Sequence, residues 1–361
     1  MIVDVNTRTF KYNSQFHIKM LTQKQLQQIK DELDNCQNPL FFFDDDPDGL
    51  CAFLLLYRYK KEGHGFVVKT HPKLDARSAP KIESYDADKV FVLDVANLEQ
   101  DFIDASKVPV IWIDHHGPYE RNNVRYFNPR LSKKDANIPT TYMCYNAVKQ
   151  DLWIAMVGCI ADYYMPDFFD EFKEKYPDLT DGKKTIGDLY FKSKVGTLIK
   201  IFSFCLKGKT SEVMKCMKVL TRIQSPYEIL NQETAQGKFI YKRYEKINRL
   251  YENLLDDAVK NIGKEKMLVY TYSDDKMSFT GDLANELLNK HPDKVIIIGR
   301  KKDDEVRMSI RSKNVVIPPI LEKSLSGLEG YGGGHEYACG ANVKQEDFNE
   351  FIKRMKANLN F

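Results

Sequence analysis

The sequence has no long apolar run and no closely spaced pair of cysteines. None of its hydrophobic stretches approaches the ~18–20 residues that a membrane-spanning helix needs. Residues 1–16 lack the basic-then-apolar pattern of a signal peptide. The seven cysteines form no CxxC pair and are scattered over mostly apolar segments, which favours buried free thiols in a reducing compartment over structural zinc. A cytoplasmic location and no membrane partner are therefore expected.

A large excess of charge is also missing. The chain has 54 basic and 51 acidic residues and a formal net charge of +3, so no global field attracts nucleic acid and any anionic substrate must be bound by local groups. No GxxxxGK[ST] segment is present, and a P-loop NTPase is not indicated. The 361 residues, 43% of them hydrophobic, are enough for two domains with sizeable cores.

Short apolar runs in the first half of the chain predict buried strands of a parallel sheet. They lie at residues 39–43, 89–93 and 108–113. Helical patterns, such as those at residues 50–59 and 151–160, separate or follow these runs, which favours a doubly wound α/β domain over residues 1–185.

The second half begins with helical periodicity and then returns to strands. Residues 186–262 carry no strand pattern and are predicted to be a helical connector rather than a flexible linker. A smaller α/β domain over residues 263–361 is predicted from strand patterns at 267–270, 295–298 and 306–311 and a helix at 281–290.

Acidic residues follow the three predicted strands of the first domain at the points where these strands end. They are Asp44, Asp46 and Asp48 of the segment DDDPDG, then Asp94, and then Asp114-His115-His116. Because ligands of open α/β sheets gather outside the carboxyl ends of the strands, these side chains are expected at one edge. Asp162, at the end of a predicted helix, is a further candidate for that edge.

This set of residue types suits divalent cations. Carboxylates combined with imidazole bind Mn²⁺ or Mg²⁺, and so many carboxylates would repel one another without a cation. Two ions that share a carboxylate would activate a water for attack on phosphorus. Each segment also has an ordinary explanation, since Asp-Pro-Asp-Gly is good turn chemistry and Asp94 alone can cap a helix. Their occurrence at three successive strand ends favours the metal site.

A glycine-rich segment near the C-terminus is the second candidate. Residues 330–334, followed by His335, contain four glycines whose backbone N–H groups can approach an anion, although a flexible turn explains them as well. Ser309 and Arg311 share one face of a preceding predicted strand, and Arg311 is suited to binding phosphate.

Together, the DxDxDG segment (Asp44, Asp46, Asp48 and Gly49), Asp94, Asp114-His115-His116, Asp162 and the late GGGH resemble the DHH phosphoesterase superfamily. More narrowly, they resemble its DHH–DHHA1 branch, which includes RecJ-like single-strand exonucleases, their archaeal relatives and oligoribonucleases (nanoRNases). Phe42 stands where many members have a histidine, whereas Asp44 matches an aspartate of RecJ-like members, so the resemblance tilts toward RecJ.

The resemblance implies a role for each matching residue. Two metal ions, usually Mn²⁺ with Mg²⁺ as an alternative, would be held by Asp46, Asp48, Asp94, Asp162 and His115, with Asp44 as an added ligand candidate. Asp94 would bridge the ions, Asp114 would orient its neighbours, and His116 would face the scissile phosphate, so that Asp114 and His116 form the catalytic pair. In the DHHA1 domain, the residues that match substrate-phosphate contacts are Ser309, Arg311, Gly332, Gly333, Gly334 and His335.

The implied activity is hydrolysis of single-stranded DNA, RNA or short oligonucleotides from an end. The alternatives are an oligoribonuclease or 3′-phosphoadenosine-phosphate phosphatase, a cyclic-dinucleotide phosphodiesterase, or a polyphosphate hydrolase with the same metal centre. A non-catalytic replication scaffold is a further alternative, and replication or repair proteins stay open as partners. The residues reveal neither the polarity of digestion nor the choice between RNA and DNA.

Overall fold

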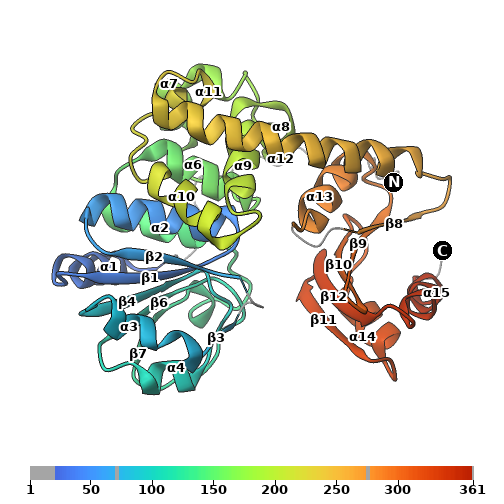
Figure 1. Cartoon of the computed structure of the whole chain (residues 1–361), viewed down its shortest axis with the longest axis horizontal. Coiled ribbons are helices and arrows are strands. Elements are labelled where there is room, and N and C mark those ends of the chain that lie inside the picture. Colours follow the sequence, from blue (N-terminus) through green and yellow to red (C-terminus); the bar gives the residue numbers. More distant parts are fainter. Residues whose placement is uncertain (1–20, 70–72, 274–276, 360–361) are drawn as a thin grey trace, which may run out of the picture. The chain divides into compact units, whose positions relative to one another are not determined.

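The computed structural model describes residues 21–69, 73–273 and 277–359. The chain divides into two compact units, Met1–Asp167 and Phe168–Phe361, and its helices and strands are labelled in Figure 1. Within the described residues, no helix combines the length and the apolar character that crossing a membrane would require.

The first unit is built on a parallel sheet with the strand order β2-β1-β4-β6-β7. Its strands are β1 (Pro39–Asp44), β2 (His64–Val68), β4 (Lys89–Leu93), β6 (Val110–Ile113) and β7 (Val124–Phe127), and β3 (Lys73–Leu74) pairs separately with β5 (Asn97–Leu98). Its helices are α1 (Gln23–Asp34), α2 (Pro47–Lys60), α3 (Pro80–Ser84), α4 (Gln100–Ala105), α5 (Thr140–Val148) and α6 (Leu152–Ala161).

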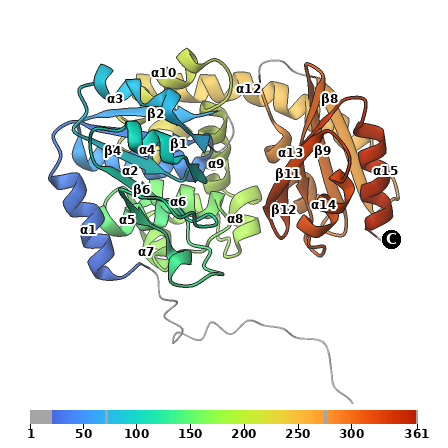
Figure 2. The ribbon, with the colours of Figure 1, turned by 90° about the horizontal axis from the view of Figure 1, so that it is seen from below.

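Both faces of this sheet are buried, which explains the continuous apolar runs of its central strands. On one face, Phe42 packs edge-on against Phe102 of α4. On the other face, Phe41 and Phe43 contact Phe53 of α2, with ring centroids 5.6 and 4.6 Å apart. The predicted doubly wound α/β domain is thereby confirmed, with helices on either side of the sheet (Figures 1 and 2).

The second unit contains helices followed by a mixed sheet. The helices are α7 (Phe169–Lys175), α8 (Ile186–Lys192), α9 (Lys194–Cys205), α10 (Thr210–Leu220), α11 (Pro226–Leu230), α12 (Ala235–Lys260), α13 (Thr280–Lys290), α14 (Pro318–Leu325) and α15 (Phe348–Asn358). The strands are β8 (Met267–Ser273), β9 (Val295–Lys302), β10 (Glu305–Arg311), β11 (Gly330–His335) and β12 (Ala338–Lys344). This agrees with a helical stretch followed by a smaller α/β region.

The sheet of the second unit has the order β11-β12-β10-β9-β8, with antiparallel pairing except between β8 and β9. Two apolar clusters cover its two faces. One joins α12 and α13 to the inner side of β8 and β9, and the other joins α14 and α15 to the opposite face. Figure 2 shows α13 and α15 on either side of the sheet. Among the described residues, the cluster with α12 and α13 includes no residue of β10, β11 or β12. On the face that this cluster covers at β8 and β9, strand β10 carries polar side chains, such as Ser309 and Arg311.

Candidate active site

The turn between β1 and α2 positions the first three aspartates. Asp46 is the N-cap of α2, and its carboxylate accepts a hydrogen bond from the Gly49 N–H at 2.9 Å. Asp48 lies in the first turn of the helix and is 1% exposed. A Cβ atom at Gly49 would lie 2.8 Å from the backbone N and O of Asp44, so only glycine lets the helix start this close to the strand.

Asp94 follows β4 in a left-handed backbone conformation (φ 61°), which aspartate tolerates better than most residues. Its N–H donates to the Ile113 carbonyl, and the indole N–H of Trp112 donates to the Val95 carbonyl at 3.0 Å. These bonds anchor the end of β4 to β6. The Asp94 carboxylate, 1% exposed, is held there by the backbone rather than by a flexible loop.

Asp114 and His116 form a hydrogen-bonded pair after β6. The Asp114 carboxylate is fully buried; it contacts His116 Nδ1 at 2.8 Å and accepts a bond from the His116 N–H at 3.1 Å. Asn128 Nδ2 and the Tyr126 hydroxyl donate to Oδ2, the oxygen that also accepts the His116 N–H, whereas Nδ1 of His116 contacts Oδ1. With both oxygens engaged, Asp114 fixes the orientation of the His116 ring through Nδ1.

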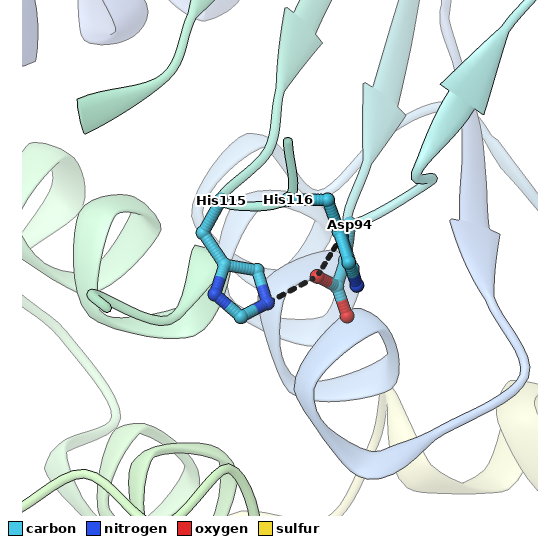
Figure 3. A group of neighbouring side chains, drawn as sticks. All are labelled: Asp94, His115 and His116. Atoms are coloured by element: carbon cyan, nitrogen blue, oxygen red, sulfur yellow. Dashed lines mark ion pairs between the residues drawn. The ribbon is translucent and has the colours of Figure 1, made fainter. Parts of the chain in front are cut away.

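The first turn of α5 and the end of α6 complete the group. Thr140 and Thr141 donate their N–H groups to the Asp48 carboxylate at 2.9 and 2.8 Å, and the Thr140 hydroxyl donates to Asp94 at 3.1 Å. Asp162 is the C-cap of α6, and its Oδ2 atom lies 3.7 Å from His115 Nδ1. The opposite ring nitrogen of His115, Nε2, lies 3.3 Å from Asp94 (Figure 3).

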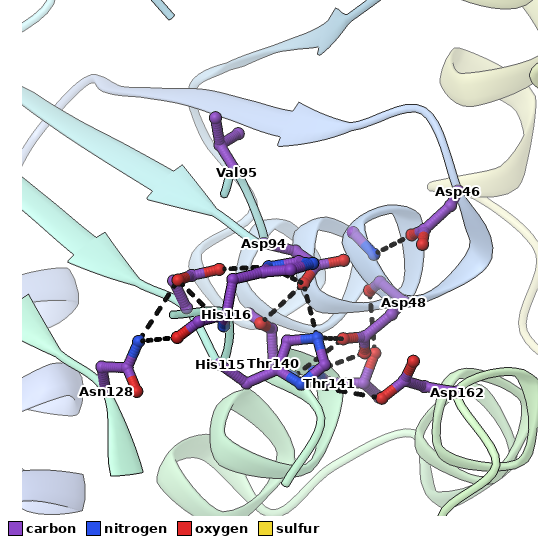
Figure 4. A network of polar contacts seen from close by, with 12 residues as sticks. Asp46, Asp48, Asp94, Val95, His115, His116, Asn128, Thr140, Thr141 and Asp162 are labelled. Carbon is purple, nitrogen blue, oxygen red and sulfur yellow. Dashed lines mark hydrogen bonds and ion pairs between the residues drawn. The ribbon is translucent and has the colours of Figure 1, made fainter. Parts of the chain in front are cut away.

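Seven side chains therefore offer ligand atoms at one place, in three groups whose atoms lie within 4.8 Å of one another. The groups are Asp94–His115–His116, Asp48–His115–Asp162 and Asp44–Asp46–Asp94. Asp94 belongs to two groups and His115 to two, which is the arrangement that two neighbouring ions sharing ligands would need. Figure 4 shows how the labelled members of this set converge from the ends of strands and helices: Asp46, Asp48, Asp94, His115, His116 and Asp162.

The carboxylates of the group lie close together in a buried place, which disfavours their charged forms. Burial, followed by the neighbouring acids, raises the pKa of Asp48 to about 7 and holds the pKa values of Asp44, Asp94 and Asp162 well above their usual range. For His116 burial acts to lower the pKa, but the hydrogen bond and charge of Asp114 outweigh it and raise the pKa to about 9.

The donor set fits divalent metal ions. No described lysine or arginine forms an ion pair with any of these aspartates. The Oδ2 atom of Asp162 is buried and accepts no hydrogen bond from the described residues. Buried carboxylates without compensating donors are costly, and hard cations with oxygen and imidazole ligands remove that cost.

A second polar group lies in the other unit, where β10 meets the start of α13. The Ser309 hydroxyl donates to Thr280 Oγ1 at 2.9 Å. Arg311 donates through Nε to Asn285 Oδ1 at 2.8 Å and through Nη1 to the carbonyls of Ile310 and Cys339. The N-cap of α13, Phe279, makes no side-chain cap. A fixed arginine beside an uncapped helix start is well suited to an anion.

The glycine-rich segment is not a turn but the edge strand β11, paired with β12. Its glycines differ in their surroundings. A Cβ at Gly332 would meet Leu321 and Ala341, whereas one at Gly333 would meet no atom within 4 Å. Gly334 has a φ of 145°, and a Cβ there would lie 2.4 Å from the Ala338 carbonyl oxygen. His335 ends the strand opposite Ala338 and is exposed.

The structure brings the eight predicted residues of the first unit together and places the six predicted substrate-binding residues, Ser309, Arg311, Gly332, Gly333, Gly334 and His335, in the second. Sequence reasoning missed Asn128, Thr140 and Thr141, which hold Asp114, Asp48 and Asp94. Pro139 followed by two threonines is a helix-start signal that could have pointed to the last two. Thr280 and Asn285, the partners of Ser309 and Arg311, carry no comparable signal.

Two family models match the chain, and they do so over separate stretches. Residues 40–165 match the DHH family, N-terminal domain, and residues 264–360 match the DHHA1 domain. The first match contains all seven ligand-bearing side chains, and the second contains Ser309, Arg311 and β11. No curated protein is similar enough in sequence to match the chain.

Several solved structures share the fold at low sequence identity. RecJ from Thermus thermophilus in complex with Mn²⁺ is 17% identical, with a TM-score of 0.71 over 95% of this chain and 56% of that one. An exonuclease RecJ bound to manganese is 15% identical, with a TM-score of 0.60, covering 93% and 94% of the two chains. The DHH domain of a member of the s1p family of ribosomal proteins is 12% identical, with a TM-score of 0.64, covering 93% and 88%. The chain thus spans little more than half the length of the Thermus RecJ.

Proposed function

Because the chain belongs to the DHH family of phosphoesterases and carries both a DHH N-terminal domain and a DHHA1 domain, we propose that it is a metal-dependent phosphodiesterase that hydrolyses single-stranded nucleic acid from an end. The observation that carries the proposal is the convergence of Asp44, Asp46, Asp48, Asp94, Asp162, His115 and His116 at one sheet edge without a compensating lysine or arginine among the described residues. Relatives of the same fold solved with manganese support Mn²⁺ as the ion, with Mg²⁺ as the second choice.

Two divalent ions held by the five aspartates and His115 would supply a hydroxide nucleophile and neutralise charge on the phosphate. The chain's own contribution is positioning. Asp94, which lies in two of the three ligand groups, would be shared between the ions. Thr140 and Thr141 keep Asp48 aimed at the same point by their N–H bonds.

The pair of Asp114 and His116 supplies a fixed proton donor. The buried Asp114 holds Nδ1 of His116 and raises its pKa to about 9, so in the metal-free protein this ring is an imidazolium at neutral pH. Held in this orientation by Asp114, the His116 ring would face the scissile phosphate, where a ring N–H would donate to a phosphate oxygen as negative charge develops there. Asn128 and Tyr126 keep Asp114 in place for this role.

The second unit would bind the substrate away from the reacting bond. Arg311, Ser309 and the first N–H groups of α13 form an anion site for a phosphate of the strand. His335 and Gly333 of β11 border the same face of the sheet. Binding energy collected there would position the strand end for hydrolysis.

The test is hydrolysis with Mn²⁺ of 5′-labelled RNA and DNA, from dinucleotides to strands of about 20 nucleotides. Controls with chelator show the metal dependence. Stepwise shortening with release of nucleoside monophosphates is the expected result, and the label pattern gives the polarity. Cleavage restricted to dinucleotides, 3′-phosphoadenosine phosphate, a cyclic dinucleotide or polyphosphate would replace the exonuclease with one of the small-substrate activities. No turnover of any of them would leave a binding role.

A further inference from the structure

The sheet of the second unit has one face on which polar residues gather. Along β10, Val306, Met308 and Ile310 point into the cluster with α14 and α15. Since successive side chains of a strand alternate between faces, Arg307, Ser309 and Arg311 point to the other side. This opposite surface, which runs from Arg300 of β9 across β10 and β12 to β11, is the open face of the sheet.

Strand register arranges the open face in rows that run across the strands. The row of Ser309 continues to Gly340 of β12 and Gly333 of β11. It offers no side chain beyond Ser309. A Cβ at Gly333 would have no neighbour within 4 Å, and one at Gly340 would meet only the Met308 carbonyl oxygen at 3.8 Å. A ligand can therefore lie along this row in contact with the backbone.

The neighbouring row, two residues back along β10, is rich in cationic and aromatic groups. Register places Arg307 opposite Arg300 of β9 and Asn342 of β12, and Asn342 opposite Tyr331 of β11. Tyr331 is 52% exposed. Stacking platforms and positive charges side by side are the usual means of binding single-stranded nucleic acid. This set, Arg300, Arg307, Asn342 and Tyr331, is called the second row below.

Arg300 is the residue of this row whose charged group has the fewest partners within the described part of the protein. It is half-buried, its Nε atom is inaccessible and has no hydrogen-bond partner among the described residues, and no described acid forms an ion pair with it. A half-buried guanidinium without an acid is costly unless it serves a ligand. Arg307, by contrast, pairs with Glu305 at 3.1 Å, and Asn342 contacts the same acid and lowers its pKa.

The two ends of β10 hold their arginines apart. Arg311 is tied to Asn285 of α13 and to the carbonyls of Ile310 and Cys339. Arg307 is tied to Glu305, in the opposite direction along the strand. One phosphate group cannot use both, so the open face has two separate cationic positions with Ser309 between them.

We propose that the second row is a second nucleotide subsite. This subsite rests on the proposed function. One nucleotide would place its phosphate beside Arg311 and Ser309, and the next nucleotide of the strand would lie on the second row. Arg300 and Arg307 would contact the next phosphate, and Tyr331 would stack on its base. The substrate class is thereby narrowed to strands that present at least two consecutive nucleotides, in preference to a mononucleotide.

The experiment measures binding to the full chain in EDTA, so that hydrolysis plays no part. Isothermal titration calorimetry compares AMP with the 5′-phosphorylated dinucleotide pApA. Wild-type protein is expected to bind pApA about tenfold more tightly, because stacking one base and one added phosphate contact are together worth at least that much. Arg300→Gln and Tyr331→Ala should each remove most of this advantage and leave the affinity for AMP unchanged.

The matched control is Arg249→Gln, which removes an exposed arginine from α12 and should change neither affinity. Circular dichroism checks the fold of each variant. Equal affinities of the wild type for AMP and pApA would overturn the subsite, and so would variants that weaken both ligands equally or neither. Binding that follows the prediction without any hydrolysis in Mn²⁺ would instead contradict the proposed catalytic function, so the two failures are distinguishable.

Discussion

At the scale of single residues, Asp94 combines a proposed role as a shared metal ligand with a left-handed backbone conformation. It ends β4 with a φ of 61°, it is 1% exposed, and it lies in two of the three ligand groups. Asparagine tolerates the left-handed conformation as aspartate does, whereas alanine pays a cost of about 1 kcal/mol there. A substitution that is meant to remove the charge alone is therefore Asp94→Asn.

Asp94→Asn is expected to lower Mn²⁺-dependent hydrolysis at least about a hundredfold, because a shared ligand is lost while the backbone keeps its conformation. Rates with labelled oligonucleotides and a circular dichroism spectrum give the two readouts. The control is Asp303→Asn, an exposed aspartate with a φ of 54° in the turn after β9. Full activity of Asp94→Asn would contradict the assignment of Asp94 as a shared metal ligand.

The same carboxylates predict how the stability of the metal-free protein depends on pH. Burial, then repulsion from Asp46, raises the pKa of Asp48 to about 7, and the pKa values of Asp94 and Asp162 are raised as well. The folded protein thus binds protons that the unfolded chain has already released above about pH 4. Because the folded state binds more protons, its free energy of unfolding falls as the pH rises.

His116 acts in the same direction. Its pKa of about 9 lies above the unfolded value, so the stability that it contributes is complete below about pH 6.5 and is lost as the pH rises toward 9. The Tm of the EDTA-treated protein should therefore fall by several degrees between about pH 5 and about pH 8.5. Saturating Mn²⁺ should raise the Tm more at the higher pH, and Asp94→Asn should flatten the slope. Thermal scans at several pH values measure both effects, and a Tm that rises with pH without metal would refute the argument.

At the scale of elements, the start of α2 depends on one glycine. Gly49 packs against the Asp44 backbone so closely that a Cβ would lie 2.8 Å from two backbone atoms, which cannot move as a flexible side chain would. Gly49→Ala should cost about 1–3 kcal/mol of unfolding free energy, the usual range for overpacking. It should also weaken Mn²⁺ binding, because Asp46 and Asp48 move with the helix.

The matched control for this element is Gly263→Ala, at which an added Cβ would meet no atom within 4 Å. Urea unfolding gives the stability difference, and calorimetric titration with Mn²⁺ gives the affinity. If Gly49→Ala binds Mn²⁺ like the control, the position of the α2 start does not govern the metal site.

The strands differ in how well they can be predicted from the sequence. The central strands β1, β4 and β6 are predictable because both their faces are buried and their sequences are continuous apolar runs. The strands β2 and β7 escape this reasoning, since exposed and half-buried positions interrupt their apolar pattern. The sequence of β11 favours a loop or turn because glycine has low strand propensity, and the pairing of this strand with β12 is a tertiary effect.

The residues of the site also fall into those that the sequence can predict and those that it cannot. Asp44, Asp48, Asp94 and Asp114 could be placed together because their positions at strand ends fix the edge on which they lie. Residues that act through hydrogen bonds from elsewhere in the chain could not. Asn128 lies 14 residues beyond Asp114, and its contact depends on how β7 pairs with β6.

At the scale of the whole molecule, the chain forms two compact units where the sequence suggested three parts. An amphipathic pattern shows that a helix has a buried face but does not show which partner buries it. Phe204 of α9 and Tyr251 of α12 pack with Phe279 and with Ile296 of β9 in one cluster. Helices α9 and α12 therefore share a core with the C-terminal sheet, and the division of the chain into domains at residues 185 and 262 stays a prediction.

The two units should respond to different ligands. Hydrogen–deuterium exchange is expected to slow on addition of Mn²⁺ at residues 44–50, 94–95, 114–116 and 140–141, because metal ligation strengthens the hydrogen bonds around Asp48, Asp94 and Asp114. With pApA in EDTA, protection should appear instead at residues 305–311 and 330–342.

Variants make this separation testable within one protein. Asp94→Asn should abolish protection by Mn²⁺ and keep protection by pApA, whereas Arg311→Ala should do the reverse, since each residue serves only one ligand. Protection by Mn²⁺ of residues 305–311 that persists in Asp94→Asn would mean that the second unit holds metal itself. The division of labour between the two units would then be wrong, and Arg311 and Ser309 would have to be reconsidered as neighbours of a metal rather than as partners of the substrate phosphate.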